Sequence, residues 1–198
     1  MARHRKSQPA SPDHVLRPGV RIGAVVSTFH AELSGAMLES AQRTLAAAGL
    51  ADGDLLVLSV PGAFELPLVA RRLAMREDVS AVLCLGVVLK GETSHDRYIA
   101  SAASRGILQA SLDADKPVLF GVLTCDTLEQ ARARALAPEE GGVEDKGREV
   151  ALAAIQALAA MDAAPTIGLG PRPMGFAARP SHAARMRRPG EVDPEAVP

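Results

Sequence analysis

Short apolar runs alternate with longer stretches of helical spacing along the middle of the chain. Runs rich in Val, Leu and Ile predict buried strands at residues 22–27, 55–60, 79–85 and 117–123. Between and after these runs, apolar residues recur every three or four positions, which is the spacing of one helix face. We predict helices at residues 32–48, 66–76, 93–112, 127–136 and 143–161.

Helix-length connections between consecutive strands decide the predicted architecture. Strands joined in this way run parallel, with helices on both faces of the sheet. The order β-α-β-α-β-α-β-α-α therefore predicts a three-layer α/β/α sandwich of the flavodoxin-like class with a four-stranded parallel sheet. Thr93 or Ser94 is expected to cap the third helix, and Thr127 with Gln130 has capping-box spacing for the fourth.

Both ends of the chain lack this apolar pattern. Residues 1–17 are polar with several prolines, and residues 163–198 are rich in Pro, Gly, Ala and Arg. We expect a flexible N-terminal arm at 1–17, one globular domain at 18–162 and a disordered tail at 163–198. Neither end is expected to join the core.

Composition narrows the function classes. Aromatic residues make up 3% of a chain that is 47% apolar and has no Trp, so a core of small aliphatic side chains is expected. Basic ends flank an acidic middle, which argues against nucleic-acid binding. Cys84 and Cys125 lie outside any CxxC pattern and indicate reduced thiols rather than a disulfide or a zinc site. Without a signal-peptide pattern or a membrane-length apolar run, we expect a cytoplasmic protein.

Ligands of open parallel sheets bind beyond the carboxyl ends of the strands, where loops and helix starts converge. This rule selects residues 27–30, 61–65, 86–95 and 124–126. Phe29 and Phe64 can present flat surfaces to a planar heterocycle or can be ordinary core residues. Glu65 can contact a ligand or only complement the dipole of the following helix.

The segment after the third strand carries the richest chemistry. Lys90, Gly91, Thr93 and Ser94 place a cation, a flexible residue and hydroxyls at a helix start, which suits an anionic phosphate. His95 can exchange protons near neutral pH, or can be an exposed histidine without a role. The sequence contains no Walker, GxGxxG or HExxH pattern, so neither a common nucleotide site nor a metal site is predicted.

Five segments in a fixed order add a resemblance to a known family. VPGAFELP at 60–67 is the most specific, and LGVVLKGETSH follows at 85–95. Shorter segments are FGVLT at 120–124, EQA at 129–131 and DKG at 145–147. Together they resemble lumazine synthase over residues 21–158, nearly the whole predicted domain.

The resemblance implies a cofactor-independent enzyme of riboflavin biosynthesis. Its substrates would be 5-amino-6-(D-ribitylamino)uracil and 3,4-dihydroxy-2-butanone 4-phosphate. By this resemblance His95 transfers protons and Arg134 holds the phosphate, Phe29 stacks on the pyrimidine, and Phe120 comes from a neighbouring subunit. The other implied substrate-binding residues are Ala63, Phe64, Glu65, Val87, Val88, Leu89, Glu92, Thr93 and Lys146. Lys146 can equally be a helix-cap residue.

Departures from the family pattern bear on the site and the assembly. His30 stands where Asn is frequent, and Lys90 stands where Arg is frequent. A long loop at 137–144 favours a free homopentamer over a decamer or a sixty-subunit shell. Residues 17–20 are expected to pair with a neighbour's sheet edge, and riboflavin synthase is a further partner that the resemblance suggests.

Two other function classes fit the same fold. One is a non-catalytic protein that binds a flavin or a lumazine without turnover. The presence of both His95 and Arg134 argues against this class. The other is a structural shell protein whose basic tails recruit cargo. Particle mass separates a shell from a pentamer, and turnover of the two substrates separates an enzyme from a binder.

Overall fold

The computed structural model describes residues 15–164. Four parallel strands lie in the order β2-β1-β3-β4. The strands are β1 (Ile22–Ser27), β2 (Leu55–Val60), β3 (Ala81–Leu89) and β4 (Val118–Cys125). The helices are α1 (Ala31–Ala47), α2 (Leu66–Ala74), α3 (His95–Ala114), α4 (Leu128–Ala135) and α5 (Lys146–Ala163), with a short 3₁₀ helix at Pro138–Glu140.

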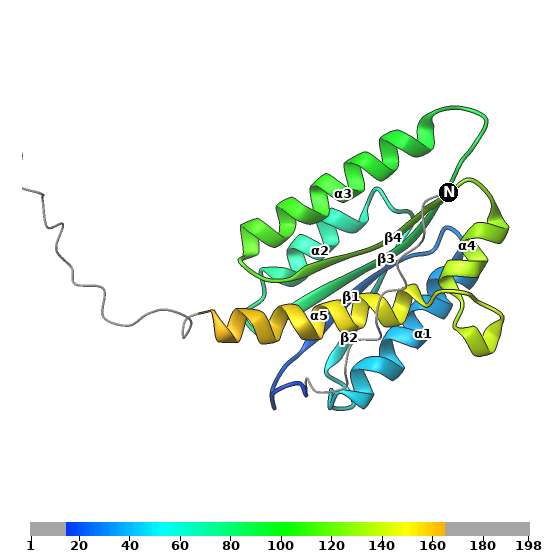
Figure 1. Cartoon of the computed structure of the whole chain (residues 1–198). Coiled ribbons are helices and arrows are strands. Elements are labelled where there is room, and N and C mark those ends of the chain that lie inside the picture. The colour runs from blue at the N-terminus through cyan, green and yellow to red at the C-terminus, as the bar shows by residue number, and fades with distance from the viewer. Residues whose placement is uncertain (1–14, 165–198) are drawn as a thin grey trace, which may run out of the picture. The chain divides into compact units, whose positions relative to one another are not determined.

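The helices cover both faces of this sheet, as Figure 1 shows. α2 and α3 lie on one face, and α1, α4 and α5 lie on the other. The three-layer α/β/α sandwich of flavodoxin-like type is therefore confirmed. Because β2 and β3 flank β1, the strand order reverses at β1, which is where doubly wound folds open a crevice for a ligand.

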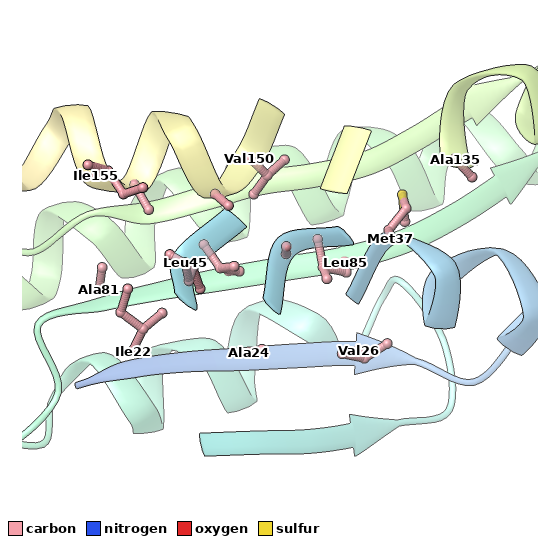
Figure 2. Close-up of a cluster of buried hydrophobic side chains, with 14 of the residues drawn as sticks. Ile22, Ala24, Val26, Met37, Leu45, Ala81, Leu85, Ala135, Val150 and Ile155 are labelled. Carbon is pink, nitrogen blue, oxygen red and sulfur yellow. The ribbon is translucent and has the colours of Figure 1, made fainter. Parts of the chain in front are cut away.

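Alternating side chains of the central strands supply two separate cores. Ile22, Ala24 and Val26 of β1 point toward α1 and α5, where Met37 and Ile155 belong to the same buried cluster (Figure 2). Val25, on the other face of β1, belongs to the cluster under α2 and α3. The predicted core of small aliphatic residues is confirmed, and it brings the helices close to the sheet.

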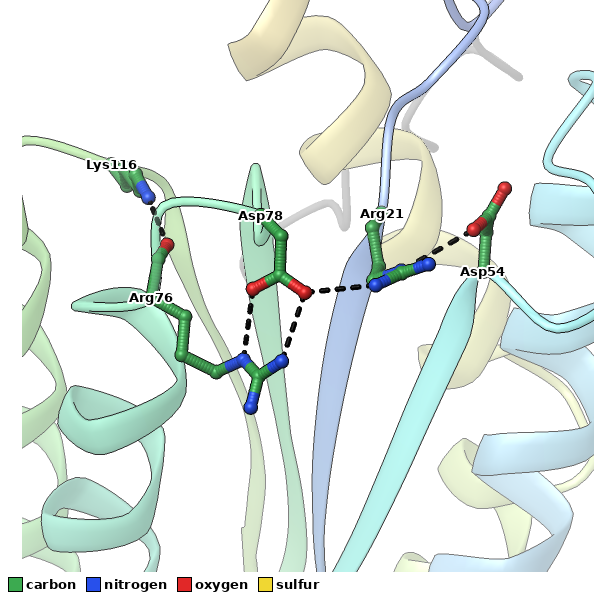
Figure 3. A network of polar contacts seen from close by, with 5 residues as sticks. All are labelled: Arg21, Asp54, Arg76, Asp78 and Lys116. Atoms are coloured by element: carbon green, nitrogen blue, oxygen red, sulfur yellow. Dashed lines mark hydrogen bonds and ion pairs between the residues drawn. The ribbon is translucent and has the colours of Figure 1, made fainter.

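A charged network joins the amino ends of the strands, opposite the predicted site (Figure 3). Arg21 lies 2.8 Å from Asp78 and 3.3 Å from Asp54, measured between guanidinium nitrogen and carboxylate oxygen. Arg76 donates two hydrogen bonds of 2.9 Å to the Asp78 carboxylate. Lys116 Nζ donates to the Arg76 carbonyl oxygen at 2.6 Å. Hydrogen bonds from Arg76 and Arg21 hold the pKa of Asp78 well below its ordinary value.

Two predicted element boundaries differ from the structure by three residues or more. β3 continues through Gly86 to Leu89, where we predicted a loop, because those residues pair with β4 from Val122 to Cys125. α5 begins at Lys146 rather than residue 143, because Asp145 is its N-cap and accepts a hydrogen bond from the Arg148 N–H at 2.9 Å.

The boundary of the predicted N-terminal arm also needs correction. Leu16 is 7% exposed and belongs to the core, and its N–H donates to the Ala48 carbonyl at 2.8 Å. The rest of the predicted arm up to residue 14, and the predicted tail from residue 165, lie outside the described residues. Within residues 15–164, no helix is both long enough and apolar enough to cross a membrane.

Candidate active site

Backbone hydrogen bonds join the loops that follow β1 and β2. The Thr28 N–H donates to the Val60 carbonyl at 2.8 Å, and the Phe29 N–H donates to the Pro61 carbonyl at 3.0 Å. These bonds extend the pairing of the two strands beyond their carboxyl ends. The loop that carries Phe29 is therefore fixed against the loop that carries Phe64.

A pocket with a volume of about 690 Å³ lies at this edge of the sheet, and its walls are largely apolar. The loops after β1 and β2, the end of β3 and the start of α3 all contribute to it. The predicted site residues that line it are Phe29, Ala63, Phe64, Glu65, Val87, Val88, Leu89, Thr93 and His95. The strand-end rule thus predicted the location of this pocket.

The two phenylalanines of the pocket are not core residues in the single chain. Phe29 is 68% exposed and Phe64 is 60% exposed. The alternative that they are ordinary buried packing residues is therefore wrong for the isolated protomer. Exposed rings beside an apolar pocket can receive a planar heterocycle.

Glu65 combines a structural contact with a place in the pocket wall. Its carboxylate accepts a hydrogen bond from the Gly62 N–H at 3.0 Å, which closes the turn between β2 and α2. It also lines the pocket. The two interpretations of Glu65 are thus compatible, because one carboxylate oxygen can hold the turn while the other faces a ligand.

The start of α3 brings polar groups to the same pocket. His95 is the first residue of α3, and Ser94 is its N-cap but makes no capping hydrogen bond through its side chain. The capping role that we predicted for Ser94 or Thr93 is therefore not realised. Unsatisfied N–H groups at a helix start favour an anion, so this end of the pocket suits a phosphate.

Four predicted site residues do not line this pocket. Glu92 is exposed in the loop before α3, and Phe120, on the outer strand β4, is 44% exposed. Lys146, at the start of α5, forms an ion pair with Glu149. Arg134 of α4 donates a hydrogen bond to the Gln130 carbonyl at 2.9 Å, and its Nε lies 3.8 Å from the Glu144 carboxylate.

Arg134 nevertheless lies close to the carboxyl end of β4. Burial raises the pKa of the Cys125 thiol, and the positive charge of Arg134 acts in the opposite direction. On the same helix, the Thr127 hydroxyl accepts from the Gln130 N–H at 3.2 Å, while Gln130 Oε1 accepts from the Asp126 N–H at 3.1 Å. The predicted Thr127 cap is confirmed, with Gln130 bonded one residue earlier than in a capping box. The helix that carries Arg134 is thereby anchored at its start.

Comparison with known proteins identifies the family. Residues 19–162 match the family model of 6,7-dimethyl-8-ribityllumazine synthase. The chain belongs to the lumazine synthase family. A relative of that name from Frankia casuarinae is 47% identical over 76% of this chain and 92% of its own length. Another, from Thermus thermophilus, is 43% identical over 73% of this chain and 90% of its own length.

Lumazine synthases catalyse the penultimate step of riboflavin biosynthesis, so the chain belongs to a family of enzymes. The family match spans the pocket and also the segments with Phe120, Arg134 and Lys146. In a single protomer, Phe29, His95 and the other lining residues form the pocket, whereas Phe120, Arg134 and Lys146 lie outside it.

Several residues of the pocket were not predicted from the sequence. Asp96, Tyr98 and Ile99 of α3 line the pocket together with His95. Their positions relative to His95 include the three- and four-residue separations of one helix face, which is a signal that the sequence contains. His30 also lines the pocket; it lies in the segment 27–30 that the strand-end rule selects, but no contact with a substrate was predicted for it.

Proposed function

We propose that this chain condenses 5-amino-6-(D-ribitylamino)uracil with 3,4-dihydroxy-2-butanone 4-phosphate to give 6,7-dimethyl-8-ribityllumazine. One observation carries the proposal. An exposed aromatic ring, Phe29, and an imidazole, His95, line one apolar pocket at the strand ends of a lumazine synthase fold. A ring to stack on and a group that moves protons are what joining a heterocyclic amine to a ketone requires.

The aminouracil fits the apolar part of the pocket. Phe29 stacks on the pyrimidine ring, and its 68% exposure supports this role because most of the side chain is accessible in the protomer. Ala63, Phe64 and Glu65 on one side, and Val87, Val88 and Leu89 on the other, line the space for the uracil and the ribityl chain. Glu65 accepts hydrogen bonds there through its second carboxylate oxygen.

The butanone phosphate occupies the end of the pocket at α3. Thr93 offers a hydroxyl there, and Glu92 offers its backbone N–H next to the open start of the helix. His95 is the first residue of α3, so its imidazole is close both to the phosphate at the helix start and to the ketone of the same substrate. We assign proton transfer to His95 during imine formation and phosphate elimination.

The reaction needs few protein groups because both substrates are reactive. The 5-amino group attacks the ketone, and loss of water gives an imine. Phosphate then leaves by elimination, and ring closure releases a second water. Holding amine and carbonyl together supplies much of the acceleration, while His95 and a phosphate-binding cation supply the remainder.

The cation comes from a second protomer. Arg134, Lys146 and Phe120 lie outside the pocket of their own chain, and all three remain accessible on its surface. We propose that a neighbouring subunit contributes these residues and that Arg134 binds the phosphate with its planar guanidinium. One pocket then contains groups from two chains.

A homopentamer is the assembly that we propose. Exposed apolar side chains support an oligomer, because contact with another subunit would bury them. Leu108 and Leu112 of α3 are 60% and 68% exposed, and Leu68 of α2 is 68% exposed. β2 is an edge strand with exposed Val57 and Leu58, which offers unpaired backbone groups to another chain. The loop at 137–144 favours a pentamer that remains free.

The cellular setting completes the proposal. Cys84 and Cys125 are free thiols, as expected in a reducing compartment, and we assign the enzyme to the cytoplasm. Riboflavin synthase, which performs the last step of the pathway, is the protein partner that we propose.

The test is to mix the purified full-length chain with both substrates and to follow the absorbance and fluorescence of the lumazine. We expect product formation well above the uncatalysed rate, with one phosphate released per lumazine. His95→Ala should slow turnover about 100-fold without abolishing it. A chain that binds the product but does not accelerate its formation would show a binding protein instead.

A further inference from the structure

His30, which lines the pocket, has an unusual backbone conformation. Its φ and ψ angles are 64° and 47°, in the left-handed region that His, Asn and Asp adopt more readily than other non-glycine residues. It is the N-cap residue of α1, and its carbonyl accepts from the N–H of Leu33 at 3.0 Å and of Ser34 at 3.2 Å. Its side chain makes no capping hydrogen bond, so the imidazole is not used to start the helix.

The imidazole instead contacts the neighbouring aromatic ring. The ring centroids of His30 and Phe29 are 4.9 Å apart, and the planes meet at 82°, an edge-to-face arrangement. This is the only contact between aromatic rings in the described part of the chain. Both residues line the pocket. The left-handed turn at His30 therefore directs the imidazole back onto the ring that precedes it.

Phe29 needs such a support because its ring projects into solvent. At 68% exposure, few atoms of the protomer restrict its side-chain rotamer. An edge-to-face partner favours one ring orientation and leaves the remaining surface of the ring open. Ordering a side chain before the ligand arrives lowers the entropy that binding must otherwise overcome.

We propose that His30 is a positioning residue that fixes the Phe29 ring in the orientation in which it stacks on the aminouracil. This inference rests on the proposed function, because it takes that stacking as given. It makes the departure from Asn at this position a determinant of affinity for the heterocycle. It assigns no step of the chemistry to His30.

Two substitutions separate ring support from backbone conformation. His30→Asn keeps a residue that tolerates the left-handed region but removes the ring. His30→Phe keeps a ring of similar reach but is strained in that region. We expect His30→Asn to melt within a degree or two of the wild type and His30→Phe to melt several degrees lower.

Ligand affinity should rank the same variants in the opposite order. In calorimetric titrations of the full-length chain with 6,7-dimethyl-8-ribityllumazine, we expect His30→Asn to weaken binding about three- to tenfold and His30→Phe to stay within about twofold of wild type. His30→Asn should raise the Michaelis constant for the aminouracil by a similar factor and leave kcat and the constant for butanone phosphate unchanged. A general loss of folding cannot produce this crossed ranking.

Wild-type affinity in His30→Asn, or equally weak binding in both variants, would overturn the inference. Phe29→Leu provides the separate test of the stacking itself and should weaken binding more than either His30 variant. If Phe29→Leu binds normally, the stacking assigned in the proposed function fails. If Phe29→Leu weakens binding while His30→Asn does not, only the role of His30 fails.

Discussion

Ser40 of α1 donates a hydrogen bond to the carboxylate of Asp145, with 2.6 Å between Oγ and Oδ2. The other carboxylate oxygen accepts from the Arg148 N–H at 2.9 Å and caps α5. One side chain thus starts the last helix and joins it to the first. Lys146 follows directly, so the position of this proposed substrate-binding residue depends on the Ser40–Asp145 pair.

Asp145→Ala should lower the free energy of unfolding by about 2–3 kcal/mol, because it removes a helix cap and leaves the buried Ser40 hydroxyl without its acceptor. Asp145→Asn, which keeps a capping oxygen, should cost about 1 kcal/mol. Urea unfolding at a fixed protein concentration measures both. Equal losses in the two variants would contradict this account of the cap.

Two glycines in helices should respond to alanine with opposite signs. A methyl group at Gly147 would lie 2.1 Å from the Met37 carbonyl oxygen, whereas one at Gly35 would meet nothing within 4 Å. Gly147→Ala should therefore destabilise the fold by about 3 kcal/mol by forcing α5 away from α1. Gly35→Ala should stabilise it by about 0.5–1 kcal/mol through helix propensity. The same unfolding assay compares them, and a stable Gly147→Ala would show that the α1–α5 contact is looser than described.

The network at the amino ends of the strands should make stability depend on acidity. The folded-state pKa of Asp78 lies below its ordinary value of 3.8, so its contribution is present above that pH and is lost as pH falls toward the folded value. At pH 7, Asp78→Asn should melt below wild type, and the gap should shrink in melts below pH 3.8. Asp52→Asn, in the exposed turn before β2, is the control and should change little at either pH. An unchanged gap at low pH would mean that the ionic contacts of Asp78 do not stabilise the fold.

Arg134→Ala should raise the Michaelis constant for the butanone phosphate about tenfold or more and that for the aminouracil much less, because the contact proposed for the guanidinium is with the phosphate alone. Arg132→Ala is a matched control on the same helix, since Arg132 lies 3.8 Å from Glu32 and is assigned no role in the site. Steady-state kinetics with each substrate varied in turn gives both constants. Equal increases for the two substrates would remove the phosphate role from Arg134.

The fold was predictable because apolar runs and helical spacing follow directly from burial on a parallel sheet. The strand prediction ended too early, at residue 85, because a glycine within a strand pattern usually indicates the end of the strand, and Gly86 follows. In the structure Gly86 lies within β3, where a Cβ would approach the Ser27 hydroxyl to 3.0 Å and Leu66 to 3.2 Å. Such a close approach is a property of packing between distant segments and leaves no local signal.

The location of the pocket was predictable for a related reason, but the parts played by His30 and Arg134 were not predictable from the residue pattern. Parallel strands bring their carboxyl ends to one edge, so the location of Phe29, Glu65 and His95 at that edge followed from where the predicted strands end. Their roles followed only from the family resemblance. The importance of His30 followed from neither, because its conformation depends on the turn between β1 and α1. Arg134 entered only through family resemblance, since a role in another subunit's site, as proposed for it, leaves no pattern in the sequence of a single chain.

The central claim is that each site combines His95 of one protomer with Arg134 of the next. Co-expressing His95→Ala and Arg134→Ala chains under separate tags, and isolating oligomers that carry both, tests it directly. In a ring of identical interfaces, about one quarter of the sites in an equal random mixture regain both residues. Assayed with butanone phosphate well below its Michaelis constant, where both parents are weak, the mixture should therefore rise to about a quarter of wild-type activity. Mixed oligomers no more active than either parent would place both residues in one protomer and contradict the account.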